Sequence, residues 1–217
     1  LAADIEKKTG LHVLGFGDSG GFFQLTNSKR PIHSPADMEG VKIRTMGLDT
    51  HKAIITAMGG QPAAISWSEV YTALQTGVAD GQMNPIPIIA FAKFQEVQKY
   101  LSITGHVYTP AYVVVSDEHF SKLPEDVQKI LQDVANDTQG FVYEEAARLE
   151  NDLLEKLKAG GMEVNEADKA AFIEASKPIY DEFSSSVEGG KELIEKVQAG
   201  APSASQVVSL TCARRWT

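Results

Sequence analysis

The amino-acid sequence predicts an α/β fold, on three observations. Short apolar segments with strand-like alternation, such as residues 41–46, are followed by segments whose apolar residues have helical spacing. Strand, loop and helix recur in this order before Pro85, which is typical of a parallel sheet. Between residues 124 and 158 the apolar positions keep a spacing of three and four, which predicts one amphipathic helix. At about 1.5 Å per residue it is some 50 Å long, so we expect it to bend at Gly140 or to span two lobes.

Composition excludes several classes of protein. The chain has 217 residues, 43% of them hydrophobic and 23% charged, which is typical of a globular protein. Its net charge is -9, and its Lys and Arg residues are interleaved with acids, so a nucleic-acid partner is not expected. The single cysteine, Cys212, excludes an intramolecular disulfide, and the five histidines lack metal-site spacing. We therefore expect no metal and no cofactor.

The N-terminal half is predicted to contain short alternating elements. A helix ends at Gly10, and an apolar strand at residues 11–16 leads into a glycine-rich loop at 17–21. The further expected elements are a strand from residue 21, a capped turn at 34–38, a strand at 41–46, a helix from Asp49 or Thr50 to Met58, a strand at 62–65, and a helix that opens with a capping-box sequence at 66–69 and ends near Gly77.

The second half begins with a predicted tight connection at residues 80–85, which places Asn84 at the entrance of a helix at 87–99. Two strands, 100–109 and 111–116, are expected on either side of Pro110. After the long helix we expect a strand at 162–164 and helices at 166–183 and 190–198, with residues 200–217 outside the core.

The sequence GDSGG makes Ser19 a candidate nucleophile, because the same five residues surround the reactive serine of chymotrypsin-like proteases. A catalytic triad also needs a histidine base and an aspartate that orients it. Only His12 precedes Ser19 on the adjoining segment, and no β-barrel is indicated. These observations argue against a chymotrypsin-like protease. The alternative function that we keep is an α/β hydrolase-like enzyme that uses Ser19, or a His and Asp pair.

Arg44 is the candidate ligand anchor, because it is the one arginine in an otherwise apolar strand at residues 41–46. In open α/β sheets, ligands bind beyond the carboxyl ends of the strands, where Arg44 is expected to lie. The competing interpretation is a structural salt bridge to an acid on a neighbouring loop.

Five segments carry a resemblance to a known family: LTNSKRPI (25–32), DMEGVKIRT (37–45), WSEVYTALQTGVADGQMNP (67–85), KFQEVQKYL (93–101) and LPEDVQK (123–129). Over residues 1–199 the chain resembles the DctP-type solute-binding proteins of tripartite ATP-independent periplasmic (TRAP) transporters. The resemblance implies a two-lobed periplasmic-binding-protein-like fold that closes on a small organic acid and delivers it to membrane permease subunits. It also implies a periplasmic location, no catalysis and no metal.

The resemblance assigns roles to five residues. Arg44 stands where the family has an arginine that forms a bidentate salt bridge with the ligand carboxylate, and Trp67 where it has an aromatic ring against the ligand. Asn84 and His106 fall on polar positions of the cleft. Many members have a second arginine where this chain has Phe23, which favours a monocarboxylate with an apolar or aromatic portion. On the residues alone, Trp67 and Phe23 could be core residues, Asn84 a turn residue and His106 an interior histidine.

The resemblance also implies a division into lobes. Residues 1–21 and 110–149 are expected to be the remnant of a first lobe, and residues 22–109 and 150–199 a complete second lobe. We expect the chain to lack the family's first segment and signal peptide, as an N-terminally truncated member would. A fragment without binding activity is therefore a further alternative.

Overall fold

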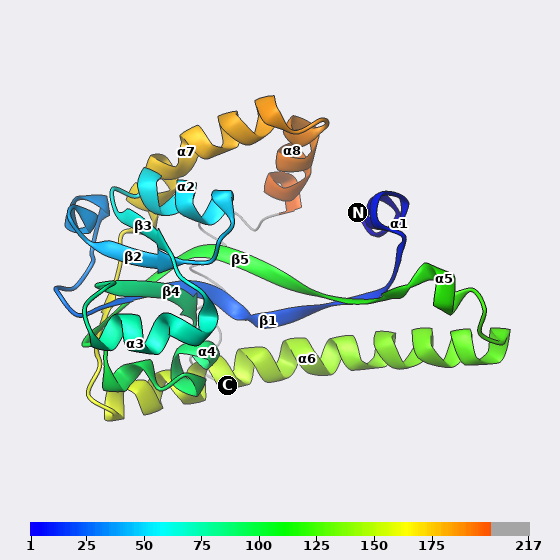
Figure 1. Ribbon diagram of the computed structural model, residues 1–217, viewed down its shortest axis with the longest axis horizontal. Helices are drawn as coiled ribbons and strands as arrows, with labels where there is room; N and C mark the ends of the chain where they lie inside the picture. Colours follow the sequence, from blue (N-terminus) through cyan, green and yellow to red (C-terminus); the bar gives the residue numbers. More distant parts are fainter. Residues whose placement is uncertain (201–217) are drawn as a thin grey trace.

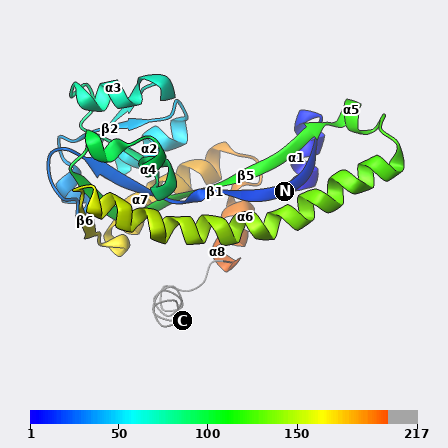
Figure 2. The same ribbon diagram turned by 90° about the horizontal axis from the view of Figure 1, so that it is seen from below.

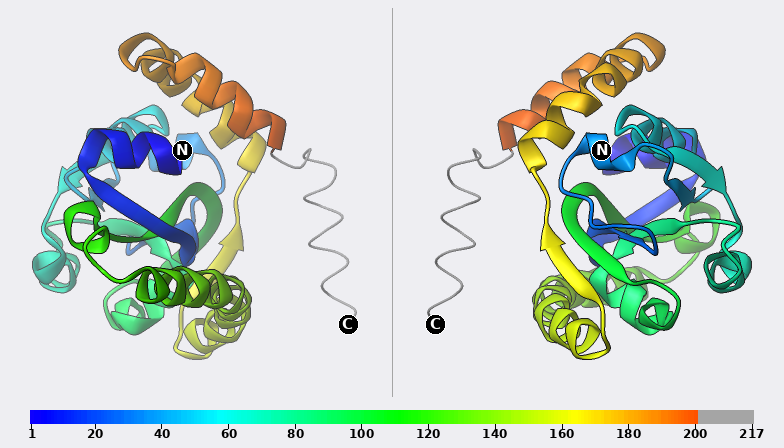
Figure 3. Two further views of the ribbon diagram at one scale, coloured as in Figure 1. Left: turned by 90° about the vertical axis from the view of Figure 1, so that its right-hand side faces the viewer. Right: turned by 90° about the vertical axis from the view of Figure 1, so that its left-hand side faces the viewer.

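The structure, a computed structural model, describes residues 1–200 as one mixed β-sheet with helices on both faces (Figures 1 and 3). Ile55 and Phe172, from helices α2 and α7, pack with strand residues such as Ile43 in one buried cluster. Leu74, Ile89 and Leu157, from α3, α4 and α6, belong to a second cluster. The α/β class predicted from the sequence is confirmed.

The sheet is mixed rather than parallel, in the order β3-β2-β4-β1-β5-β6. Strand β2 is parallel to β3 and β4, and β5 is parallel to β6, whereas β1 is antiparallel to β4 and β5. The strands are β1 Leu11–Asn27, β2 Lys42–Thr45, β3 Gln61–Ala64, β4 Gly81–Pro85, β5 Tyr100–Ser116 and β6 Glu163–Glu166. The prediction of a parallel sheet therefore holds only for β2, β3 and β4, and for the β5 and β6 pair.

Strands β1 and β5 form a long antiparallel ribbon, and both were predicted to be interrupted (Figure 2). The predicted loop at residues 17–21 lies inside β1, as a bulge between Asp18 and Phe22. Gly20 and Gly21 have φ angles of 114° and 89° and donate their backbone N–H groups to Oδ1 of Asp18, so the glycines bend the strand without ending it. Pro110 lies within β5 opposite Asp18, next to this bulge, where a missing N–H is tolerated.

The predicted connection at residues 80–85 is also wrong, because residues 81–85 form β4, a strand that is buried along its whole length. Its first residue must be glycine: a Cβ atom on Gly81 would lie 2.1 Å from the carbonyl oxygen of Thr26. The expected capping box at residues 66–69 is absent as well. Ser66 makes no side-chain cap, and a 3-10 turn, Trp67–Glu69, leads into α3.

The long helix is confirmed as α6, Glu125–Ala159, which continues through Gly140 and runs along the β1 and β5 ribbon (Figures 1 and 2). Gln132 and Gln139 fasten it there by hydrogen bonds to the backbone of Leu14 and Phe16. The other helices are α1 Ala2–Thr9, α2 Asp49–Ala57, α3 Val70–Gln75, α4 Ile86–Phe91, α5 Asp117–Phe120, α7 Lys169–Ser186 and α8 Gly190–Gly200, with 3-10 turns at Pro35–Met38, Trp67–Glu69 and Phe94–Glu96.

Within residues 1–200, no helix is both long and apolar enough to cross a membrane. The predicted tail at residues 200–217, with Cys212, lies outside the described residues apart from its first residue. The division into lobes stays a prediction.

We predict that Gly81→Ala lowers the free energy of unfolding by about 3 kcal/mol, because the added methyl group forces β1 and β4 apart. The matched control is Gly140→Ala on the exposed side of α6, where no atom lies within 4 Å of the new Cβ. This change should raise the free energy of unfolding by about 0.5–1 kcal/mol. Urea denaturation measures both, and equal effects of the two substitutions would contradict the packing at Gly81.

Candidate ligand-binding site

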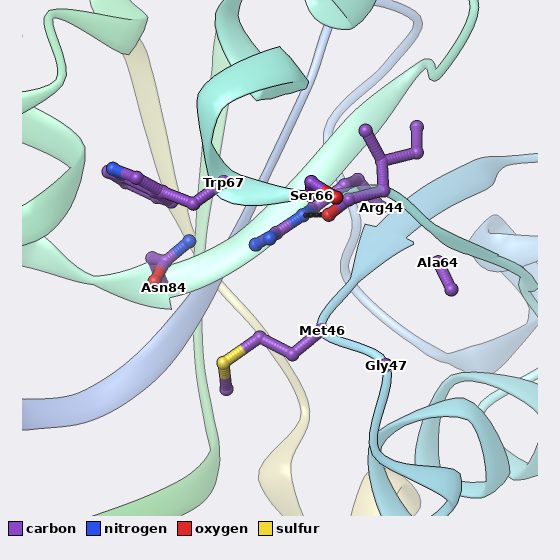
Figure 4. A pocket seen from close by; sticks show the side chains of 8 residues that line it. Arg44, Met46, Gly47, Ala64, Ser66, Trp67 and Asn84 are labelled. Carbon is purple, nitrogen blue, oxygen red and sulfur yellow. Dashed lines mark hydrogen bonds between the residues drawn. The ribbon is translucent and has the colours of Figure 1, made fainter.

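A cavity of about 570 Å³ opens where the parallel strands β2, β3 and β4 reach their carboxyl ends (Figure 4). Ligands of open α/β sheets bind at such edges. The lining residues come from these strands and from the segments that follow them: Arg44, Met46, Gly47, Ala64, Ile65, Ser66, Trp67 and Asn84. Of the five residues predicted from the sequence, the structure brings Arg44, Trp67 and Asn84 together.

Arg44 is a buried cation that faces this cavity. Its side chain is held by a hydrogen bond of 2.8 Å from Nε to the carbonyl oxygen of Ile65, and the residue is only 3% exposed. The end of the guanidinium group points into the space beside Trp67 and Asn84 (Figure 4). Burial lowers the pKa of Arg44, but an arginine stays protonated in proteins.

No carboxylate among residues 1–200 forms an ion pair with Arg44, so the structural salt bridge considered as an alternative is not found there. The ring of Trp67 lies beside the cation, with its centroid 5.8 Å from Cζ of Arg44. A cation and an aromatic face attract each other only modestly. The charge of Arg44 is therefore without a balancing anion in the described part of the chain.

Trp67 and Asn84 form the opposite part of the cavity wall. Trp67 is 48% exposed, and its ring packs against Phe94 at a centroid distance of 5.9 Å, which fixes one end of the indole. Asn84 lies in β4 and is 8% exposed; its Nδ2 atom donates a hydrogen bond to Oε1 of Gln82. A partly exposed aromatic surface and a fixed amide therefore face the same space as Arg44 (Figure 4).

Phe23 and His106 do not line this cavity. Phe23 is 4% exposed and packs in the hydrophobic core, with its ring 5.8 Å from that of His51. His106 contacts Oγ1 of Thr104 through Nδ1, and its Nε2 atom is buried. Burial, with a smaller contribution from His51, lowers the pKa of His106 to about 3. A direct ligand contact by either residue stays a prediction.

Other lining residues were not predicted from the sequence. Met46 follows Arg44 by two positions, so the alternation of β2 would have placed it on the same side. Ser66 and the carbonyl group of Ile65 lie in the connection after β3, and nothing in their residue types indicates a site. Gln82, which accepts a hydrogen bond from Asn84, lies in the segment 80–85, for which the sequence predicts a tight connection. That prediction gives no reason to expect Gln82 beside the cavity.

Ser19 is not arranged as a nucleophile. Its hydroxyl group donates to the carbonyl oxygen of Thr109 across the β1 and β5 ribbon. His12 instead contacts Glu6, with 3.2 Å between Nδ1 and Oε1, and stacks on Phe120. No triad is assembled around Ser19 in the described residues, and no group of three potential metal ligands occurs there.

One protein family matches most of the chain. Residues 1–186 match the family model DctP, described as bacterial extracellular solute-binding protein, family 7, and the chain belongs to this family. The family resemblance predicted from the sequence is confirmed, and this assignment favours solute binding over the hydrolase alternative.

Individual relatives agree with the family assignment. A solute-binding protein of Verminephrobacter eiseniae is 38% identical over 193 residues, which are 88% of this chain and 56% of that protein. The 2,3-diketo-L-gulonate-binding periplasmic protein YiaO of Escherichia coli is 35% identical over 91% of this chain and 60% of its own length. A TRAP periplasmic solute-binding protein of Chromohalobacter salexigens, solved with bound D-glucuronate, superposes with a TM-score of 0.87 at 30% identity, covering 92% of this chain and 66% of that one.

The chain therefore spans little more than half the length of the curated relatives that it matches.

The neutral ring of His106, whose Nε2 atom is buried, predicts a pH-dependent stability. Its pKa is about 3 in the folded protein against 6.5 ordinarily, so between these values the unfolded chain binds a proton that the folded chain does not. The contribution of His106 is complete above pH 6.5 and is lost progressively as the pH falls toward 3. Urea unfolding of the wild type and His106→Gln at several pH values should show a weaker pH dependence for the variant. An NMR titration of the His106 ring with a midpoint near 6.5 would contradict this account.

Proposed function

We propose that this chain is the solute-binding component of a TRAP-type transporter and that Arg44 binds the carboxylate of a small organic acid. One observation carries the proposal: a buried guanidinium group faces an open cavity, and no carboxylate of residues 1–200 pairs with it. The family assignment supports the same interpretation, because relatives are named as periplasmic proteins that bind organic acids.

The energetics favour a charged ligand group at this position. A hydrogen bond to a charged partner contributes roughly 1.5–3 kcal/mol, and a buried ion without its partner costs about 3–5 kcal/mol. The bond from Nε of Arg44 to Ile65 leaves the two terminal nitrogen atoms of the guanidinium group for a ligand. A planar carboxylate fits this pair of donors in a bidentate arrangement, whereas a neutral group leaves the charge uncompensated.

The rest of the wall gives the proposed ligand a polar end and an apolar side. Trp67, Met46 and Ile65 supply apolar surface, and Asn84 supplies an amide. Many family members have a second arginine at the position of Phe23, which is a buried core residue in this chain. Phe23 therefore supplies no cation for a second carboxylate of the ligand. We therefore propose a monocarboxylate as the ligand class. D-Glucuronate, bound in the related structure, is a suitable first probe.

Delivery of the acid to membrane permease subunits, in the periplasm, is the remaining part of the proposal. The family assignment and the periplasmic names of relatives support it. We further propose that residues 1–21 and 110–149 belong to a first lobe, that residues 22–109 and 150–199 form the second lobe, and that closure of the lobes completes the cleft.

We predict that the wild type binds D-glucuronate but not D-glucose, which lacks the carboxylate, and that Arg44→Ala lowers the affinity for D-glucuronate at least about 100-fold. Asn84→Ala removes a single neutral contact and should cost about 10-fold. Isothermal titration calorimetry of the wild type and both variants measures these changes.

The matched control is Arg148→Ala, which removes an exposed arginine of α6 that is paired with Glu145 and Asp152. Its affinity for D-glucuronate should equal that of the wild type. Equal binding of D-glucose and D-glucuronate, or unchanged affinity in Arg44→Ala, would overturn the carboxylate assignment.

A further inference from the structure

Four buried polar side chains form a continuous row from the cavity into the protein. Nδ2 of Asn84 donates to Oε1 of Gln82 at 2.5 Å, and Nε2 of Gln82 donates to Oγ1 of Thr26 at 2.9 Å. Oγ1 of Thr26 in turn donates to Oε1 of Gln98 at 3.0 Å. Apart from Asn84, which is 8% exposed at the cavity, no member of the row is more than 4% exposed.

The far end of the row sets its direction. Nε2 of Gln98 lies 3.0 Å from the carbonyl oxygen of Val97 and 3.3 Å from that of Asp80. Carbonyl groups only accept hydrogen bonds, so the NH₂ group of Gln98 must face them and its oxygen must face Thr26. The single hydroxyl proton of Thr26 is then committed to Gln98.

The same reasoning passes along the row to the cavity. Because Oγ1 of Thr26 accepts on its other side, Gln82 must turn its NH₂ group to Thr26 and its oxygen to Asn84. Asn84 must therefore give an N–H group to Gln82, and no described residue donates to its own oxygen, Oδ1. Two backbone carbonyl groups at the far end thus decide which way the amide at the cavity is turned.

We propose that Thr26, Gln82 and Gln98 are positioning residues that hold Asn84 with Oδ1 available as an acceptor, so that the site selects an acid that also carries a hydroxyl group. Strand β4 places Gln82 directly beside Arg44 in the parallel register, so this acceptor lies at the same edge of the sheet as the cation. The ligand's carboxylate binds Arg44 and its hydroxyl donates to Asn84. The part of this inference that concerns the ligand rests on the proposed function. The arrangement of the row does not depend on it.

Packing alone does not account for the row. Replacing a buried hydrogen-bonded pair by apolar groups of the same shape is nearly neutral for stability, so a sheet of this kind has no need of four polar members. A fully satisfied network does specify one arrangement of its side chains. We infer that the network serves to fix the orientation of the Asn84 amide at the cavity.

The first test is independent of any ligand. In the ligand-free wild type, NMR should show one side-chain amide proton of Asn84 that exchanges slowly with solvent, because it is donated to buried Gln82. Thr26→Val keeps the shape but removes the hydroxyl group, and should speed this exchange about tenfold, whereas Thr26→Ser should behave as the wild type. Backbone amide protection of Leu25 and Ile43 serves as the control for folding. Unchanged exchange at Asn84 in Thr26→Val would overturn the positioning role.

The second test measures selectivity with two probes that share a four-carbon skeleton and a carboxylate, D-erythronate and butanoate. The wild type should prefer D-erythronate, and Thr26→Val should reduce this preference roughly fivefold while leaving the affinity for butanoate unchanged. Thr26→Ser should restore the preference. Equal losses for both acids in Thr26→Val would contradict the inference. If the wild type binds neither acid, the proposed function fails on these probes, and the exchange measurement alone decides the positioning role.

Discussion

The charge of Arg44 is the constraint on which the site depends. The sheet buries this cation at the carboxyl end of β2 and holds it by one bond to the backbone of Ile65, yet residues 1–200 supply no carboxylate to balance it. A buried ion without a partner is costly, so we expect the carboxylate of the proposed ligand to stabilise the folded protein. We therefore propose that part of the binding free energy for organic acids comes from balancing the charge of Arg44, which the ligand-free protein leaves unbalanced among residues 1–200.

The sheet topology decides where that charge can act. Because β2, β3 and β4 are parallel, their ends and the segments after them meet at one edge, which brings Arg44, Trp67 and Asn84 around one cavity although they are far apart in sequence. The antiparallel strands β1 and β5 run across the middle of the sheet and carry α6 along their length (Figure 1). Gln82, on the parallel strand β4, donates a hydrogen bond to Thr26 on the antiparallel strand β1. This bond connects the cavity edge of the parallel strands to the antiparallel part of the sheet.

The sequence allowed the α/β class, β2 with Arg44, and the long helix to be predicted, because each has a clear period of apolar residues. Strand β4 could not be predicted in the same way: its polar members Gln82 and Asn84 are flanked by Asp-Gly and Asn-Pro, which are typical of turns, and only the tertiary fold satisfies their amides. The bulge at Gly20 was mistaken for a loop for the same reason. The row beyond Asn84 joins segments that are distant along the chain, and no local pattern reports it.

The account implies that Arg44 favours ligand binding but lowers the stability of the ligand-free protein. The most direct measurement is the free energy of unfolding of Arg44→Met without ligand. Methionine has a similar volume and no charge, so the account predicts a free energy of unfolding equal to or higher than that of the wild type, together with loss of stabilisation by D-glucuronate. A fall of about 3 kcal/mol or more in the ligand-free variant would contradict it, because it would show that the protein already balances the charge of Arg44.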